Sequence, residues 1–443
     1  MAKKKQIELT IEEKLQNALV PKEEQPYKIP SNWCWTYIHN IAIVVTGKTP
    51  SKKNKEYYGG KFPFFKPADL DAGRNMQYAT EYLSEKGKSI SVIIPEKATG
   101  ICCIGTIGKC GYFLVEGTTN QQINTVISKI NPLYSYYFFN TNSFVRELIS
   151  KASATTIAIV NKSKLESCLF PVAPLNEQQR IVNRIESLFV KLDRAKELIE
   201  NTLAQFEQNK MAILHKAFTG QLTVKWRKEN NIDLSSWKKC ELKEVFKVVK
   251  DKYNPQTENQ IVNYIGLENI ETSKGIISKS NSSEVKSIKT KFKKDDVLYG
   301  KLRPYLNKHD VVNFDGICST DILVFRFNDI NTAKYINYYF NLPMFIQYAV
   351  ENSSGINLPR VSEKTISKYK ISLPTIEEQQ EIVNILDNLL AKYNKIKNLE
   401  QQLEKIELLK KAILAKAFRG ELGTNNPDEE SAENLLKEIL AEK

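Results

Sequence analysis

The most regular pattern in this chain is a stripe of apolar residues that occurs twice. In the first stripe the apolar residues follow one another at steps of four and three: Ile181, Ile185, Leu188, Leu192, Ala195 and Ile199, continued by Phe206 and Ile213. In the second stripe they are Ile382, Leu386, Leu389, Tyr393 and Ile396, followed by Leu403, Leu409 and Ile413. This heptad spacing predicts two long helices, each of which needs a partner helix to cover its stripe.

The two predicted helices share one sequence. Glu177-Gln178-Gln179 recurs as Glu378-Gln379-Gln380, and residues 212–222 recur as 412–422. Both copies begin at a capping residue and end at a glycine, so each has about 40 residues and is roughly 60 Å long. We expect the copies to pack antiparallel as a coiled coil about a pseudo-twofold axis. The alternative, in which each helix packs on its own neighbouring domain alone, does not account for the repeat.

Each predicted helix follows a block of short β-type runs separated by Gly, Asn and Pro. We expect strands at 100–104, 111–115 and 124–127 in the first block, and at 296–299 and 322–327 in the second. Helices are expected at 135–151 and 331–351, and residues 156–161 align with 357–362. The predicted fold class is α+β, with two similar globular domains separated by two long antiparallel coiled-coil helices.

These patterns divide the chain into six segments. The globular domains cover residues 27–173 and 223–373, and the long helices cover 174–222 and 374–422. An N-terminal helical extension occupies residues 1–26, and a C-terminal tail with a short amphipathic helix occupies 423–443. The sequence does not decide whether these two ends pack together or contact a partner.

The net charge of +13 is concentrated in the two globular blocks. Residues 27–173 hold 17 Lys and Arg against 9 Asp and Glu, and residues 237–373 hold 22 against 15. Two separate basic blocks suit a polyanion that is contacted in two places, and nucleic acid is such a partner. A protein that is basic throughout is the alternative, but the rest of the chain is slightly acidic.

Motifs for catalysis, cofactors and metals are missing from the sequence. Residues 42–49 fit a loose phosphate-loop pattern, but Pro50 and a polar loop follow instead of the required helix. Asn131-Pro132-Leu133-Tyr134 resembles a methyltransferase motif but lacks its second proline and a glycine-rich cofactor loop. The seven cysteines have no metal-ligand spacing, which favours buried thiols. We expect a protein with no chemistry of its own.

The sequence also bears on location. No stretch approaches the ~20 apolar residues that a membrane helix needs. The lysines after Met1 are followed by polar residues rather than by the apolar core of a secretory signal. We therefore expect a cytoplasmic protein.

The order of basic block, Glu-Gln-Gln helix, second block and second helix resembles the specificity (S) subunit of type I restriction-modification systems. Local matches are Ile29-Pro30-Ser31-Asn32-Trp33, Gly47-Lys48-Thr49-Pro50, Tyr57-Tyr58-Gly59-Gly60 and residues 297–305. The resemblance covers nearly the whole chain. It implies that each block is a target recognition domain that reads one half of an asymmetric bipartite site in double-stranded DNA, while the coiled coil sets the spacer.

The resemblance also implies partners. Methyltransferase (M) subunits, two in number, would dock on the helices, and a restriction (R) subunit with translocase and nuclease activity would join that complex. S-adenosylmethionine, ATP and magnesium belong to those subunits. This chain would therefore need no cofactor and would not be an enzyme.

Candidate DNA contacts are polar side chains on loops, because Lys and Arg neutralise phosphates while amides and guanidinium groups reach base edges. In the first block the candidates are Lys48, Thr49, Lys52, Lys53, Asn120, Gln121 and Gln122. In the second block they are Lys301, Arg303, Tyr305, Thr320 and Arg360. The alternative for each residue is a solvated or structural role, and Lys301 in particular is a possible ion-pair partner of Asp321.

Two other functions stay open at this point. A stand-alone methyltransferase or nuclease would bind S-adenosylmethionine or carry a catalytic motif, and the sequence has none. A coiled-coil adaptor that does not bind DNA would retard no DNA even with its partners present. The twin basic blocks argue against the adaptor.

Overall fold

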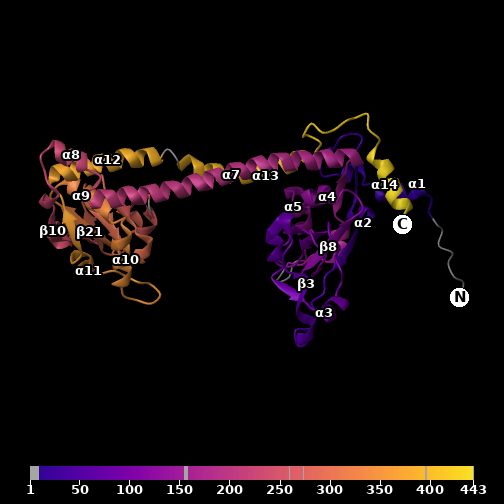
Figure 1. The fold of residues 1–443 in the computed structure, drawn as a ribbon, viewed down its shortest axis with the longest axis horizontal. Coiled ribbons are helices and arrows are strands. Elements are labelled where there is room, and N and C mark those ends of the chain that lie inside the picture. Colours follow the sequence, from indigo (N-terminus) through magenta and orange to yellow (C-terminus); the bar gives the residue numbers. More distant parts are fainter. Residues whose placement is uncertain (1–8, 154–157, 259, 273, 395–396, 443) are drawn as a thin grey trace. The chain divides into compact units, whose positions relative to one another are not determined.

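The computed structural model describes residues 9–153, 158–258, 260–272, 274–394 and 397–442 (Figure 1). The chain forms two compact units. Unit 1 consists of Met1–Leu198 and Gln401–Lys443, and unit 2 consists of Ile199–Glu400. Each unit therefore combines one globular block with part of each long helix.

Unit 1 is built on a four-stranded antiparallel sheet with the order β2-β8-β5-β6. These strands are Ala42–Thr46, Ile123–Ser128, Thr99–Cys102 and Cys110–Tyr112. In two smaller sheets, β1 (Cys34–Tyr37) pairs with β9 (Leu169–Val172), and β3 (Tyr58–Phe65) lies between β4 (Glu81–Leu83) and β7 (Thr118–Thr119). Helices α4 (Pro132–Phe139) and α5 (Asn142–Ser150) contribute Phe138 and Phe144 to the same core cluster as Ile101 and Val126 of the sheet.

Unit 2 repeats this arrangement with the order β11-β21-β18-β19. The four strands are Phe246–Val248, Ile322–Phe327, Val297–Gly300 and His309–Val311. β10 (Lys238–Glu241) pairs with β22 (Lys370–Leu373), and helices α9 (Ile330–Tyr339) and α10 (Pro343–Glu351) follow β21 as α4 and α5 follow β8. The internal repeat predicted for the helices thus extends through the globular blocks, and the α+β class is confirmed.

The second sheet of unit 2 is larger than its counterpart in unit 1. Its order is β12-β17-β20-β13-β16, from strands Lys252–Tyr253, Lys289–Phe292, Gly316–Cys318, Asn263–Ile265 and Ser280–Asn281. In both units one pair of strands in this sheet is parallel, namely β3 with β7 and β13 with β20. The sheet of unit 2 has two more strands than that of unit 1.

The helical stretches predicted at 135–151 and 331–351 are confirmed, and each consists of two helices rather than one. Thr141 ends the first run because its hydroxyl caps a new helix by accepting from the Phe144 N–H at 3.2 Å. In unit 2 the break falls at Pro343, which stands at the first position of α10. Proline suits that position because it has no N–H to donate within a helix.

The first long helix is α7, Leu175–Phe218, which is continuous over 44 residues. The second copy is described as α12 (Ile376–Asn394) and α13 (Lys397–Ala417). Two residues of the predicted stripe, Tyr393 and Ile396, lie outside the residues whose side chains the structure describes. Leu409 is 50% exposed and does not belong to the stripe, whereas Ile406 is 5% exposed and continues it.

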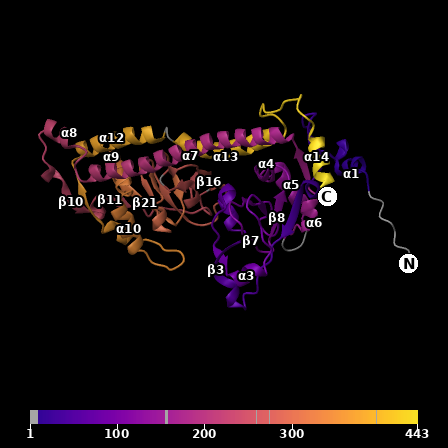
Figure 2. The same cartoon turned by 45° about the vertical axis from the view of Figure 1, so that its right-hand side comes forward.

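The helices pair antiparallel within each unit. In unit 1, α13 runs beside α7 in both views (Figures 1 and 2). Two ion pairs join them: Lys410 with Asp193 at 2.5 Å, and Glu407 with Lys196 at 3.4 Å. The residue number falls along α13 as it rises along α7, so the two helices are antiparallel. In unit 2, Leu214 near the end of α7 shares a core cluster with Ile382 near the start of α12. The predicted antiparallel coiled coil is thereby confirmed inside each unit.

The two ends of the chain pack together in unit 1. Helix α1 (Ile11–Ala18) lies against α14 (Ala432–Ala441), and Leu15 and Leu436 are buried in the same cluster. Thr10 caps α1 in a capping box with Glu13. The two ends therefore pack with each other as part of unit 1. The sequence had left open whether they do so.

Candidate nucleic-acid interface

The end of each long helix inserts a phenylalanine into a globular core. Phe418, directly after α13, has its ring centroid 4.9 Å from Tyr134 and 5.2 Å from Phe138 in unit 1. Phe218, the last residue of α7, lies 5.0 Å from Tyr335 and 4.9 Å from Tyr339 in unit 2. Each globular block is therefore joined through its core to the end of the helix that arrives from the other block.

The start of α7 buries a glutamate that binds the entry of the first block. Glu177 is 0% exposed, and its carboxylate accepts a hydrogen bond from Trp33 Nε1 at 2.7 Å. Asn425 Nδ2 donates to the same oxygen at 2.9 Å, and Thr424 donates to the other at 3.3 Å. These four residues fasten the globular block, α7 and the C-terminal tail to one another.

The start of α12 repeats this contact with a charged donor. Glu378 is 0% exposed and accepts from Trp237 Nε1 at 2.9 Å and from Thr223 at 2.6 Å. Arg227, which is nearly buried, donates to the same carboxylate at 2.5 Å. The repeated Glu-Gln-Gln motif thus has a physical explanation, because its first residue anchors a tryptophan in the first part of each block.

The neighbouring glutamine of the motif orders the chain that leads into each helix. Gln178 donates to the Ala173 carbonyl at 2.8 Å, and Gln379 donates to the Pro374 carbonyl at 2.8 Å. Both side chains are buried. Sequence reasoning identified the motif by its repetition but did not identify its tryptophan partners, although Trp33 and Trp237 occupy similar places in the first part of each block.

In unit 1 the structure brings most of the candidate residues together. The backbone N–H of Lys48 donates to Thr119 O at 2.9 Å, and the Thr49 hydroxyl donates to Gln121 Oε1 at 2.5 Å. Lys52 and Lys53 are exposed on the loop that follows Thr49. The loop after β2 and the turn before β8 therefore form one polar surface, which we call the unit 1 loop surface.

Asn120 differs from the other candidates of the unit 1 loop surface. It is 8% exposed, and its amide donates to Gln122 Oε1 at 2.9 Å. Its side chain thus supports the loop from inside, whereas Gln121 is exposed beside it. Among these amides, Gln121 is the one that is placed to contact a ligand.

In unit 2 the candidates also converge. Arg303 N donates to Pro359 O at 2.7 Å, Leu302 pairs with Arg360, and Lys301 N donates to Asp321 O at 2.9 Å. Thr320 is exposed beside Asp321, and Tyr305 is 53% exposed on the same loop as Arg303. Residues 301–305, 320–321 and 358–360 therefore form the unit 2 loop surface.

The ion pair expected between Lys301 and Asp321 has a different cation. Asp321 Oδ1 accepts from Arg360 Nε at 3.1 Å, and Lys301 meets Asp321 through its backbone alone. Arg360 and Asp321 are 39 residues apart in sequence. This pairing therefore depends on the tertiary fold and has no local signal.

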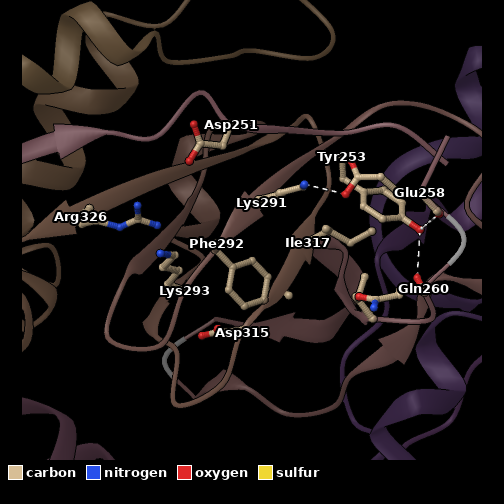
Figure 3. A pocket seen from close by; sticks show the side chains of 12 residues that line it. Asp251, Tyr253, Glu258, Gln260, Lys291, Phe292, Lys293, Asp315, Ile317 and Arg326 are labelled. Carbon is tan, nitrogen blue, oxygen red and sulfur yellow. Dashed lines mark hydrogen bonds and ion pairs between the residues drawn. The ribbon is translucent and has the colours of Figure 1, made fainter.

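Unit 2 also contains a pocket of about 410 Å³ beside β17 (Figure 3). Phe292 and Ile317 contribute apolar surface to it, and three cations face three acids around them. Lys291 pairs with Glu258 at 2.6 Å, and Arg326 binds Asp296 through two hydrogen bonds. Because the charges that line it are balanced, this pocket is less suited to a polyanion than the exposed loop surfaces.

Burial shifts the pKa of several titratable groups among the described residues. Burial raises the pKa of the Cys34 thiol to about 12 and that of Cys103 to about 11, so both are inert. Burial lowers the pKa of His309 to about 4. In the part of the chain that the structure describes, no cluster of His, Cys, Asp or Glu could hold a metal, and no helix is long and apolar enough to cross a membrane.

Comparison with known families decides what this arrangement is. The profile of the type I restriction modification DNA specificity domain matches residues 30–207 and again residues 235–408. The chain belongs to this family. The two matches coincide with the two copies of the repeat, so each copy of block and helix is one specificity domain.

Curated members of the specificity-subunit family align over nearly the whole chain. The EcoDI specificity subunit of Escherichia coli is 24% identical over 94% of this chain and 96% of its own length. The EcoKI specificity subunit of Escherichia coli K12 is 26% identical with the same coverage. The MjaIX specificity subunit of Methanocaldococcus jannaschii is 24% identical over 90% of this chain.

Solved structures agree on the fold. A chain from a study of complex assembly and conformational transition of the type I R-M system has a TM-score of 0.68 at 18% identity and covers 89% of this chain. The HsdS subunit of Thermoanaerobacter tengcongensis has a TM-score of 0.55 at 18% identity and covers 90% of it. The specificity-domain fold is therefore shared at low sequence identity.

Proposed function

We propose that this chain is the subunit that reads the DNA sequence for a type I restriction-modification complex. Unit 1 would read one half of an asymmetric bipartite site through its loop surface, and unit 2 would read the other half. The observation that carries this proposal is the structural repeat. Two blocks with the same sheet order each place an exposed polar residue in the turn before an equivalent strand, β8 or β21, and each is anchored to the helices by a Trp–Glu contact.

The continuous helix supports a role in setting the distance between half-sites. α7 has 44 residues without interruption, which is about 66 Å at 1.5 Å per residue. Because Glu177 anchors its start to one block and Phe218 anchors its end to the other, the length of α7 would set the unread spacer. The recognition domains would be residues 27–173 and 223–373, with residues 174–222 and 374–422 as spacer helices.

Exposed residues that recur on both helices support the docking of two copies of one partner. Leu175 and Ile376 are 54% and 52% exposed at the starts of α7 and α12. Gln179 and Asn183 recur as Gln380 and Asn384, and all four are exposed. Two methyltransferase subunits, joined by a restriction subunit, would make use of them.

The chemistry of such a complex would reside in those partners. S-adenosylmethionine, ATP and magnesium would bind to the methyltransferase and restriction subunits, and this chain would contribute recognition without catalysis. It would act in the cytoplasm, where the host DNA is. The competing proposal is an adaptor that uses the helix pair without binding DNA.

The first experiment is to map N6-methyladenine in the host genome before and after deletion of this gene. We expect one asymmetric motif, with two short blocks around a fixed gap, to lose methylation completely. If no bipartite motif disappears, DNA retardation by the complex reconstituted with methyltransferase subunits separates the two proposals. Retardation of no DNA would support the adaptor.

The second experiment tests the spacer. Four residues inserted at the middle of both long helices add about 6 Å, so the gap should lengthen by one or two base pairs at about 3.4 Å each. A matched insertion after Asn231, in an exposed turn outside the helices, should leave the gap unchanged. An unchanged gap in the helix variant would refute the spacer role.

A further inference from the structure

The hairpin loops after β5 and β18 begin with the same backbone contacts but carry different side chains. The loop after β5 begins at Cys103, whose N–H donates to Gln122 O at 2.8 Å, and the loop after β18 begins at Lys301, whose N–H donates to Asp321 O at 2.9 Å. Two residues later both backbones are left-handed, with φ of 82° at Gly105 and 52° at Arg303. Arg303 thus occupies a position that unit 1 gives to glycine.

An arginine in this conformation is unfavourable unless its side chain is needed. Glycine adopts positive φ without steric cost, whereas other residues do not. Asn307, also left-handed, has a reason inside the fold, because its buried amide donates to Phe340 O at 3.0 Å and contacts His309. Arg303 is exposed, and among the described residues no group accepts a hydrogen bond from its guanidinium. The benefit of Arg303 must therefore come from a ligand.

A second arginine lies on the neighbouring segment. Arg360 lies on the strand-like segment that pairs with Leu302, and Asp321 holds its Nε at 3.1 Å. A carboxylate on Nε restricts the side chain while Nη2 stays unbonded within the described residues, so the planar group is oriented in advance. In unit 1 the corresponding residue is Ile159, which pairs with Ile104 in the same way. Unit 1 therefore presents no guanidinium at either position.

We propose that Arg303 and Arg360 read guanine in the half-site taken by unit 2. This inference rests on the proposed function and names the bases that this surface selects. An arginine donates two parallel hydrogen bonds to O6 and N7 of guanine in the major groove, which is the commonest specific contact of this side chain. Unit 1, with Gln121 exposed at the corresponding turn, lacks this means of selecting guanine.

The test compares Arg303→Gly with Arg303→Lys in the complete complex, by mapping methylated motifs in a strain deleted for the gene. Arg303→Gly copies unit 1 and relieves the positive φ, so its Tm should be no lower than that of the unaltered protein. We expect one guanine in one half of the motif to become degenerate, with about 5- to 150-fold loss of discrimination, and the other half to stay intact. Arg303→Lys keeps the charge but replaces the planar fork by a single ammonium, so it should lose only part of the discrimination for that guanine.

The matched control is Asn307→Gly, which also replaces a left-handed residue in this loop. It should lower Tm and leave the motif unchanged. A reconstituted complex also allows a test on one atom, because 7-deazaguanine at the assigned position removes N7. The unaltered complex should bind that duplex more weakly than the guanine duplex, whereas Arg303→Gly should bind both equally.

The outcomes separate the two proposals. If deletion of the gene removes no bipartite motif, the proposed function fails and this inference fails with it. If the motif exists but Arg303→Gly leaves it unchanged, or lowers methylation of all sites equally as a lost phosphate contact would, the proposed function stands and guanine reading is overturned. A motif half that loses specificity for a base other than guanine overturns it as well.

Discussion

The two units each bury an equivalent glutamate at the start of a long helix, but the donors around it differ in charge. In unit 1 the buried carboxylate of Glu177 is surrounded by neutral donors, from Trp33, Thr424 and Asn425. In unit 2 the equivalent Glu378 receives Arg227 in addition to Trp237 and Thr223. The cation that fastens unit 1 lies elsewhere, as Arg180 of α7 binds Glu429 of the tail. A repeated fold thus preserves the position of the anchor while its electrostatics diverge.

This difference matters because the loss of stability on substitution is larger for a buried ion pair than for a buried carboxylate with neutral donors. Removing one partner of a buried pair leaves the other charge without compensation, which costs more than losing neutral hydrogen bonds. An anchor built on neutral donors tolerates loss of its acceptor better. The following predictions test that contrast between the units.

The largest effect is expected for Glu378→Gln. Arg227 would remain buried without its carboxylate, so unit 2 should lose about 3–5 kcal/mol of stability. Hydrogen exchange of α9 and β22 reports on unit 2, and exchange of α4 reports on unit 1 as the internal control. Equal destabilisation of both units would contradict the assignment of this contact to unit 2.

A smaller effect is expected for Glu177→Gln, the matched substitution in unit 1. Its amide oxygen still accepts from the Trp33 indole, and no buried cation loses its partner. The loss should be about 1.5–3 kcal/mol, the range for hydrogen bonds to a charged group. The measurement is exchange of α4 and α14. A loss larger than that of Glu378→Gln would break the comparison.

Acidification should weaken unit 2 more than unit 1. His309 is buried, and its pKa is lowered from 6.5 to about 4 by burial, whereas the equivalent Cys110 of unit 1 is a buried neutral thiol. A lowered pKa means that the unfolded chain binds the proton first, so stability is complete above pH 6.5 and declines as pH falls toward 4. At pH 5 the loss should be about 2 kcal/mol.

The control for this prediction is His309→Cys, which copies unit 1. Its unit 2 should show no greater decline between pH 7 and pH 5 than unit 1 does, as measured by exchange of β19 at both pH values. If the decline persists unchanged in His309→Cys, another group is responsible for it.

The smallest effect is expected for Glu429→Gln. The side chain of Arg180 is 39% exposed, and exposed ion pairs contribute about 0.2–1 kcal/mol. The Arg180 hydrogen bonds lower the pKa of Glu429, so in the unaltered protein this contribution is present above the ordinary pKa of a glutamate and declines as pH falls below it. Exchange of α14 at neutral pH is the measurement. Complete release of α14 would show that the ion pair, rather than the apolar contact with α1, holds the tail.

Much of the fold was predictable because it is periodic or repeated. The heptad stripe from Ile181 to Ile213 predicts α7, and the recurrence of Glu-Gln-Gln predicts its partner helix. Strand β21 was predicted at its observed bounds, since alternating β-branched and aromatic residues are a local signal. The breaks at Thr141 and Pro343 were missed because the apolar pattern continues through them, although a capping threonine and a proline stand there.

The candidate site was predictable as a set of loops but not as a surface. The chemistry and polar surroundings of Lys301, Arg303 and Arg360 make them candidates for DNA contact. Nothing in the sequence indicates that residues 301–303 and 359–361 pair with each other. The sequence also does not predict the positive φ of Arg303. A glycine would have indicated such a backbone conformation, and glycine occupies this position only in unit 1, as Gly105.

The sequence by itself determined that this chain has two related basic blocks and two related helices, because periodicity and repetition act over neighbouring residues and can be counted. Only the tertiary structure decided which residues meet: Glu378 with Arg227, 151 residues apart, and Arg360 with Asp321, 39 residues apart. Such contacts arise from the closure of sheets and helices around a core. Their partners are selected by the whole fold, and no local pattern encodes them.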